Sequence, residues 1–269
     1  MATKTARKVS QQRFLPPHRV RWLLAATSIA VALGVWWYFR TGNVSDWAGS
    51  DRAGIRLPLR YPVHGIDVSK FQGTIEWRRV RRMRLAEKEE DTLRPSFVFI
   101  KATEGQGLTD RAFQRNWAGA RKAGLRRGAY HFYLPFRDPV RQANHFFRTV
   151  VLEKGDFAPV LDIELNAPKP DADIIRDLNI WLNLVETHYG IRPIIYTNPY
   201  FYKKFIRGHF DEYPLWIADY SNERLAGYPS GQVQFWQHSK SGWCEGIGGQ
   251  VDFNVFLFDE DKMEDICLD

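Results

Sequence analysis

The run of residues 157–164, Phe-Ala-Pro-Val-Leu-Asp-Ile-Glu, ends in two carboxylates, Asp162 and Glu164. The run is apolar and rich in strand-forming residues, and side chains two positions apart in a strand point to the same face. Two carboxyl groups held close together do not ionise independently, so one tends to keep its proton while the other is charged. Most glycosidases use a protonated acid and a nearby carboxylate to break a glycosidic bond. The pair therefore predicts either glycoside hydrolysis at the end of a strand or, as the alternative, two surface acids that follow a strand.

Strand-forming runs alternate with helical runs through residues 62–269. The expected strands are 64–69, 97–102, 127–133, 158–164, 193–197, 215–220, 233–238 and 251–256, and the expected helices are 75–85, 110–123, 139–152, 172–189 and 199–206. Asp110 is placed to cap its helix and Gly124 to end it. The alternation predicts an α/β fold with a parallel sheet, and about eight strands in this length predict a closed TIM-like barrel. We expect the barrel to be irregular at its last strands, where little chain is left for helices.

Acidic, amide and aromatic residues recur at the carboxyl ends of the expected strands, where barrels of this type hold their active sites. Two further acids, Asp67 and Asp252, are expected in the same mouth as the first pair. The candidate substrate-contacting residues at these ends are Tyr130, Tyr196, Trp216, Asp219, Gln237 and Lys101. The aromatic ones are suited to sugar faces and hydroxyls, with core packing as the alternative, whereas His131 is expected to support its strand.

Other common kinds of active site leave no trace in the sequence. No serine nucleophile with a His and Asp partner stands out, and no phosphate-binding glycine loop or cluster of metal ligands is found. We therefore expect neither a metal nor another cofactor.

The strand-end motifs resemble, in order, those of the glycoside hydrolase family 25 lysozymes, the Chalaropsis-type N-acetylmuramidases. The matching stretches are 64–69 (HGIDVS), 97–105 (FVFIKATEG), 128–133 (GAYHFY), 159–164 (PVLDIE), 195–198 (IYTN), 215–218 (LWIA), 234–237 (QFWQ) and 251–254 (VDFN). The resemblance covers about residues 62 to 257. It implies a flattened barrel of eight strands and about five helices, and hydrolysis of the β-1,4 bond between N-acetylmuramic acid and N-acetylglucosamine in peptidoglycan.

The resemblance also implies roles for the four acids. Glu164 matches the general acid, which protonates the leaving oxygen and later activates water. Asp162 matches the second carboxylate, which assists attack by the acetamido group of the substrate and so gives retention; direct nucleophilic attack by Asp162 is the alternative. Asp67 and Asp252 match the remaining pocket acids, which orient the substrate and tune the central pair.

Two other functions fit the same sequence less well. One is a catalytically inactive peptidoglycan-binding scaffold held at the membrane, and the other is a glycosidase of the same barrel that acts on a different N-acetylated glycan. The presence of all four acids favours an active enzyme over a scaffold.

The N-terminal part of the chain predicts a membrane anchor. Residues 22–39 form an uncharged, mostly apolar run between Arg21 and Arg40, near the minimum length for a bilayer-spanning helix. Trp and Tyr residues lie near its ends, and basic residues precede it. We expect a basic cytoplasmic tail at 1–21, a transmembrane signal-anchor at 22–39, and the rest of this single-pass protein outside the cytoplasm. A cleaved signal peptide is the alternative, although no clear cleavage site follows the run.

The basic charge of the chain is confined to this anchor region. Residues 1–40 contain seven of the 38 Lys and Arg residues and no acid, which leaves 31 basic against 31 acidic residues in the remainder. A nucleic acid is therefore not an expected partner of the folded part. The expected partners are peptidoglycan glycan strands and, through the N-terminal helix, the membrane.

Between the anchor and the catalytic domain, expected at 62–269, residues 40–61 show turn-forming residues without sustained periodicity, and we expect a linker there. Cys244 and Cys267 both lie late in the chain. In an exported protein an even count permits one disulfide between them, and two unpaired buried thiols are the alternative.

Overall fold

The computed structural model describes residues 46–87 and 92–269. The chain divides into two units, Met1–Asp46 and Trp47–Asp269, and the second of these is compact. The expected cytoplasmic tail at 1–21 and signal-anchor at 22–39 lie outside the described residues. Within the described ranges, no helix combines the length and the apolar character needed to cross a membrane. The second unit holds all the elements that follow.

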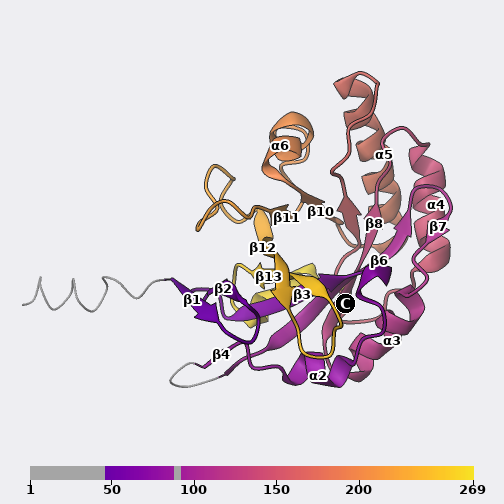
Figure 1. The fold of residues 1–269 in the computed structure, drawn as a ribbon. Coiled ribbons are helices and arrows are strands. Elements are labelled where there is room, and N and C mark those ends of the chain that lie inside the picture. The colour runs from indigo at the N-terminus through magenta and orange to yellow at the C-terminus, as the bar shows by residue number, and fades with distance from the viewer. Residues whose placement is uncertain (1–45, 88–91) are drawn as a thin grey trace, which may run out of the picture. The chain divides into compact units, whose positions relative to one another are not determined.

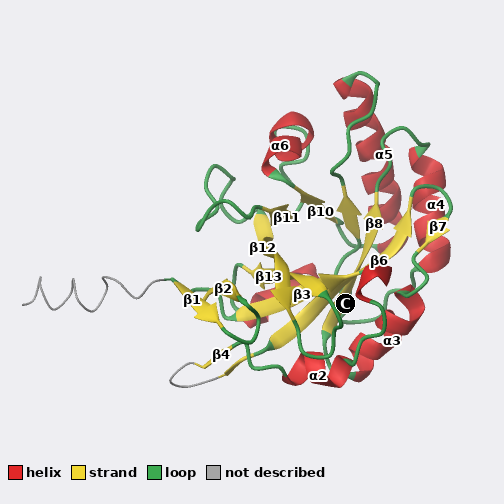
Figure 2. Ribbon diagram, viewed as in Figure 1, coloured by secondary structure: helices red, strands yellow, loops and turns green. Residues whose placement is uncertain are grey.

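Eight strands close into a barrel, which confirms the predicted α/β barrel (Figures 1 and 2). In order around the ring they are β3 (Val63–Val68), β6 (Pro95–Glu104), β8 (Arg126–Phe132), β9 (Val160–Asp162), β10 (Ile194–Thr197), β11 (Leu215–Ala218), β12 (Val233–Trp243) and β13 (Gln250–Phe256). Neighbouring strands are parallel, except that β13 is antiparallel to both β12 and β3. Only residues 244–249 join β12 to β13, which is too short for the crossover that parallel strands need.

Helices flank much of the ring. The α-helices among the described residues are α2 (Trp77–Arg82), α3 (Phe113–Lys122), α4 (Pro139–Thr149), α5 (Asp171–Tyr189) and the short α6 (Pro199–Phe201), which continues into the π-helical η2 (Tyr202–Ile206). Two 3-10 helices, η1 (Lys70–Gln72) and η3 (Glu260–Ile266), follow β3 and β13, and the short strands are β4 (Ala86–Glu87), β5 (Thr92–Leu93) and β7 (Leu108–Thr109). Helices α2 to α5 lie outside the strands on one side of the barrel (Figure 1).

Alternation along the strands separates an inner core from an outer one. Inward-facing rings fill the barrel, and Phe99 stacks on Trp216 with ring centroids 4.3 Å apart. Outward-facing residues such as Ile100 and Leu161 are fully buried in the layer that includes the helices. Because aromatic rings occupy the interior, the barrel is a packed core, and polar side chains gather at its mouth.

Two inward-facing glycines give these rings their space. A Cβ added at Gly65 would lie 2.5 Å from the Phe97 ring, and one added at Gly128 would lie 2.5 Å from the Phe99 ring. Any larger residue at either position would push a ring out of the core, so both strands need glycine where they pass closest to the aromatic filling.

The predicted linker at 40–61 is wrong for most of its length. Strands β1 (Trp47–Ser50) and β2 (Ile55–Pro58) form an antiparallel hairpin. Leu57 is fully buried in the outer core, and the Trp47 ring meets Trp236 of β12 edge-on at 5.4 Å. The backbone N–H of Trp243 donates to the carbonyl of Ala53 at 2.8 Å. The hairpin thus packs against the barrel near β12 and is part of the folded unit.

The two cysteines are free, so the disulfide option is wrong and the alternative of two buried thiols holds. Cys244 lies in the outer core, next to Glu245, whose backbone N–H donates to the Met83 sulfur at 3.3 Å. Cys267 lies in the inner core, where Arg126 donates to its sulfur at 3.1 Å. The two thiols therefore belong to different packing layers.

The start of α3 also differs from the prediction. The residue before this helix is Ala112, and no side chain caps it. Asp110 instead accepts a hydrogen bond from the backbone N–H of Ala112 at 2.8 Å and another from that of Lys70 at 2.9 Å. Asp110 therefore ties the segment before α3 to the segment after β3.

Candidate active site

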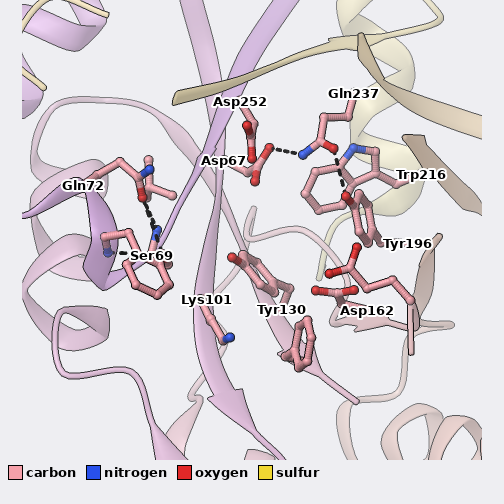
Figure 3. A pocket seen from close by; sticks show the side chains of 14 residues that line it. Asp67, Ser69, Gln72, Lys101, Tyr130, Asp162, Tyr196, Trp216, Gln237 and Asp252 are labelled. Atoms are coloured by element: carbon pink, nitrogen blue, oxygen red, sulfur yellow. Dashed lines mark hydrogen bonds between the residues drawn. The ribbon is translucent and has the colours of Figure 1, made fainter. Parts of the chain in front are cut away.

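A cavity of about 220 Å³ opens at the carboxyl ends of the parallel strands. Most of the predicted site residues line it together (Figure 3). They are Asp67, Lys101, Tyr130, Asp162, Glu164, Tyr196, Trp216, Gln237 and Asp252, and the further lining residues are Val68, Ser69, Phe71, Gln72 and Phe132. Side chains from strands far apart in the sequence thus converge on one pocket.

Strand β9 positions the central pair of acids. The strand ends at Asp162, but backbone hydrogen bonds still join this part of the chain to the segments on both sides. Tyr133 N–H donates to the Asp162 carbonyl at 2.8 Å, and Ile163 N–H donates to the Tyr196 carbonyl at 3.0 Å. Ile163 is fully buried and belongs to the outer core. Asp162 and Glu164, on either side of it, therefore face the cavity, as the spacing of two predicts.

The environment favours the protonated forms of both acids. Burial raises the pKa of Asp162 well above its usual range, and the charge of Glu164 raises it further. Burial also raises the pKa of Glu164, followed by the charge of Asp67. Lys101 opposes both shifts. One oxygen of Asp162, Oδ1, is buried and has no hydrogen-bond partner among the described residues, so it is available to a donor from a bound ligand.

Strands β3 and β13 place the other two acids side by side. Asp67 and Asp252 are opposite each other in the antiparallel ladder, and burial followed by the charge of Asp252 raises the pKa of Asp67 strongly. The pKa of Asp252 is raised to about 6, chiefly by burial. Because β13 runs in reverse, Asp252 reaches the mouth from near the start of its strand.

Amide side chains hold Asp67 in place. Gln237 and Asn254 each donate to its Oδ2, at 2.7 and 2.8 Å. Tyr196 in turn donates to the Gln237 side-chain carbonyl at 2.8 Å, and Trp216 donates to that of Asn254 at 2.8 Å. The polar atoms of Tyr196, Trp216 and Gln237, expected to contact substrate, are therefore engaged in positioning an acid. The role of Asn254 was not foreseen, although it lies two residues after Asp252.

Lys101 and Tyr130 line the same cavity (Figure 3). Lys101 Nζ is 2.7 Å from Glu104 Oε2 and 4.3 Å from the centroid of the Phe132 ring. Burial and the surrounding acids raise the pKa of Tyr130 strongly, so its hydroxyl stays neutral. The cavity lining thus includes one lysine, the two tyrosines Tyr130 and Tyr196, and four acids.

The supporting role predicted for His131 agrees with its surroundings. The side chain is fully buried in the outer layer, bonds to Thr103 and Gln142, and stacks on Trp181. Burial lowers its pKa to about 3, so the imidazole stays neutral and away from the acids.

Asp219, predicted as a groove residue, is absent from the lining of the cavity. Its carboxylate accepts hydrogen bonds from the Ser221 backbone at 3.0 Å and the Asn222 side chain at 2.7 Å. Asp219 therefore shapes the turn after β11, a use that its position at a strand end does not reveal.

Ser69, Phe71 and Gln72 line the cavity but were missed by the sequence reasoning. Ser69 ends the motif 64–69 that contains Asp67, and Phe71 and Gln72 come just after it, so their proximity to Asp67 was the available signal. Within residues 46–87 and 92–269, no group of three or more His, Cys, Asp or Glu side chains is arranged to hold a metal ion.

Comparison with known proteins places the chain among enzymes that act on sugars. Residues 66–247 match the family described as glycosyl hydrolases family 25. The Escherichia coli K12 protein YegX is 44% identical over 203 residues, which are 75% of this chain and 72% of YegX. Lysozyme M1 of Streptomyces globisporus is 31% identical over 228 residues, covering 78% of this chain and 72% of that enzyme.

Solved structures agree with this placement. A family 25 glycosyl hydrolase from Bacillus anthracis has a TM-score of 0.67 at 30% identity, covering 81% of this chain and 99% of that one. A bacterial lysozyme from Streptomyces coelicolor has a TM-score of 0.65 at 28% identity, covering 76% of this chain and 96% of that one.

Proposed function

The chain belongs to glycosyl hydrolases family 25 and is a glycosidase, and on this basis we propose that it hydrolyses peptidoglycan at the β-1,4 bond between N-acetylmuramic acid and N-acetylglucosamine. The observation that carries the proposal is the convergence of Asp162, Glu164, Asp67 and Asp252 on one cavity. The lysozyme names of relatives such as lysozyme M1 support the substrate.

Glu164 is the general acid in this proposal. Its raised pKa keeps the proton available, and that proton passes to the glycosidic oxygen as the bond between this oxygen and the anomeric carbon breaks. The departing sugar leaves with a hydroxyl group. Glu164 is then a carboxylate, ready to accept a proton in the second half of the reaction.

Asp162 directs the nucleophile, which is the acetamido group of the substrate itself. The partnerless Oδ1 of Asp162 accepts the acetamido N–H, and the acetamido oxygen bonds to the anomeric carbon to give an oxazolinium-like intermediate. Water then attacks this carbon, its proton passes to Glu164, and the bond to the acetamido oxygen breaks. Two inversions give net retention, and substrate assistance is a known exception to catalysis by a carboxylate nucleophile.

The substrate and the bond cleaved can be tested with the full-length protein in detergent. Incubation with purified peptidoglycan, followed by borohydride reduction, is expected to convert muramic acid at new reducing ends to muramitol. Reduced glucosamine at those ends would contradict the proposed bond. Binding without any new reducing end would support the inactive scaffold, and cleavage of only another N-acetylated polymer would indicate a different substrate.

The stereochemical course needs a separate measurement. Proton NMR of a soluble glycan fragment during the first minutes of reaction is expected to show the β-anomer before mutarotation. Initial formation of the α-anomer would contradict both retention and substrate assistance.

We also propose that residues 22–39 anchor the protein in the membrane with the catalytic domain outside the cytoplasm. The apolar run and the basic flank support this topology. Full-length protein in the membrane fraction, with the domain open to protease added from outside the cytoplasmic membrane, is the expected result. A shortened protein in the soluble fraction would instead indicate a cleaved signal peptide.

A further inference from the structure

We propose that Phe71, with Lys70 beside it, forms a binding platform for a glycan sugar that carries a carboxylate. This inference rests on the proposed function, because it assigns a further specificity-determining element to the same cavity. Neither residue was among the predicted site residues.

Phe71 is a large apolar side chain left in water beside the acids. Its side chain is 80% exposed, yet it lines the cavity that holds the four carboxyl groups. An isolated exposed apolar residue needs no explanation, but an aromatic ring at the rim of a polar pocket can cover the apolar face of a sugar. Contact with a sugar ring would remove much of this ring from water.

The turn that carries Phe71 is fixed before any ligand binds. In η1, Ser69 N–H donates to the Gln72 side chain at 2.9 Å, and the Ser69 hydroxyl accepts from the Phe71 backbone at 3.3 Å. The Gln72 side chain also donates to the Gln250 carbonyl of β13 at 3.2 Å, and Lys70 N–H donates to Asp110 at 2.9 Å. A platform held from two sides loses little conformational freedom when it binds a ligand.

Phe71 lines the same cavity as the central pair of acids and lies between Ser69 and Gln72 in the sequence. Ser69 and Gln72, which flank Phe71, are across the pocket from Asp162, with Asp67 and Asp252 between the two sides (Figure 3). A sugar ring held by Phe71 would therefore meet the acids across the cavity. Phe71 has no group that can transfer a proton, so its contribution is binding.

Lys70 gives the platform its chemical preference. Its ammonium group is 5.3 Å from the centroid of the Phe71 ring, and no ion pair joins it to an acid among the described residues. N-acetylmuramic acid carries a lactyl ether whose carboxyl group is free where the stem peptide has been removed, whereas N-acetylglucosamine has no such group. Of the sugars in peptidoglycan, the platform is therefore suited to N-acetylmuramic acid without its peptide.

Steady-state kinetics on glycan strands from which the peptides have been removed, so that the lactyl carboxylates are free, test the aromatic part. For Phe71→Ala we expect KM to rise about tenfold with kcat unchanged, because uniform binding is lost. Phe71→Trp is expected to restore KM. Val151→Ala is the control, since Val151 is an exposed apolar residue between α4 and β9 and is 73% exposed. A wild-type KM for Phe71→Ala would overturn the inference while leaving the proposed function intact.

Lys70→Gln tests the preference for a carboxylate. We expect KM on the same strands to rise about two- to fivefold, the range for an exposed ion pair. The Kd for an N-acetylglucosamine oligosaccharide, which has no carboxylate, is expected to stay unchanged in Lys70→Gln and to rise in Phe71→Ala. Equal loss on both ligands in Lys70→Gln would refute the preference. If the wild-type protein fails to cleave the strands, the proposed function is wrong. The binding platform can then still be tested, by comparing the Kd of the same variants for the strands with that of the wild type.

Discussion

Asp67 and Asp252 are direct cross-strand partners in the ladder between β3 and β13, and the charge of Asp252 adds to burial in raising the pKa of Asp67. Two buried carboxyl groups this close do not ionise independently, so one of them tends to keep its proton. Asp67 also accepts two amide N–H groups on its other side, which favour a negative charge there. The cavity thus contains a second pair of interacting acids beside the Asp162–Glu164 pair.

The raised pKa of Asp252 predicts that this acid lowers the stability of the folded protein at neutral pH. The pKa of Asp252 rises from 3.8 to about 6 on folding, so the folded protein holds this proton more tightly than the unfolded chain. The stabilising effect of the proton is complete below pH 3.8 and is lost as the pH rises through about 6. Asp252→Asn is therefore expected to raise the free energy of unfolding at pH 7.5 by on the order of 1 kcal/mol, with no gain at pH 3.5. Thermal denaturation at the two pH values checks this, and an equal change at both would contradict it.

Removal of the general acid is expected to abolish most turnover without unfolding the protein. Glu164→Gln keeps the shape of the side chain and loses the proton, which is worth about 10²–10⁴-fold in rate. The rate of release of new reducing ends from peptidoglycan measures the effect, with circular dichroism to verify the fold. Activity close to that of the wild type would remove Glu164 from its assigned role.

Lys101 is expected to set the pH range of activity. Its positive charge lowers the pKa of both Asp162 and Glu164, so Lys101→Met should raise both values and move the profile of kcat/KM against pH to higher pH, by about 1 unit. Lys122→Met, an exposed change on α3, is the control. An unshifted profile for Lys101→Met would show that this charge does not act on the acids during turnover.

The hairpin is expected to contribute to the stability of the barrel. Leu57→Ala leaves a cavity at a fully buried position and should lower the free energy of unfolding by roughly 2–5 kcal/mol. Arg60→Ala, an exposed change just after β2, should have little effect. If urea denaturation gave the same stability for Leu57→Ala and the wild type, residues 47–58 would behave as a linker after all.

The barrel and the convergence of its acids could be predicted because they depend on local pattern. Period-two alternation in 158–164 places Asp162 and Glu164 on the inner face, and each barrel strand carried a similar signal. The reversed direction of β13 was not predicted, because it depends on the length of the connection before it rather than on the residues of the strand.

The errors arose where tertiary contacts decide the outcome. Strands β1 and β2 have four residues each, with a glycine in one and a proline in the other, so their sequence resembles a linker. Their place in the fold depends on the burial of Leu57 and on the contact of Trp47 with Trp236. Asp219 directly follows a strand, as Glu164 does, but its carboxylate accepts hydrogen bonds from the turn after β11 and does not line the cavity. Phe71 gave no signal in a pattern-based reading because the exposure of a side chain beside a cavity depends on the folded structure.

The reversal of β13 makes the acid content of the pocket depend on strand alignment. Asp252 is flanked by the apolar residues Val251 and Phe253, both buried in the outer core. Deleting one residue from 244–249 would favour a shift of the strand by one position, which turns alternate side chains to the opposite face. An apolar side chain would then oppose Asp67, so the shortest connection in the barrel, which holds no pocket residue itself, governs whether the fourth carboxylate is present at all.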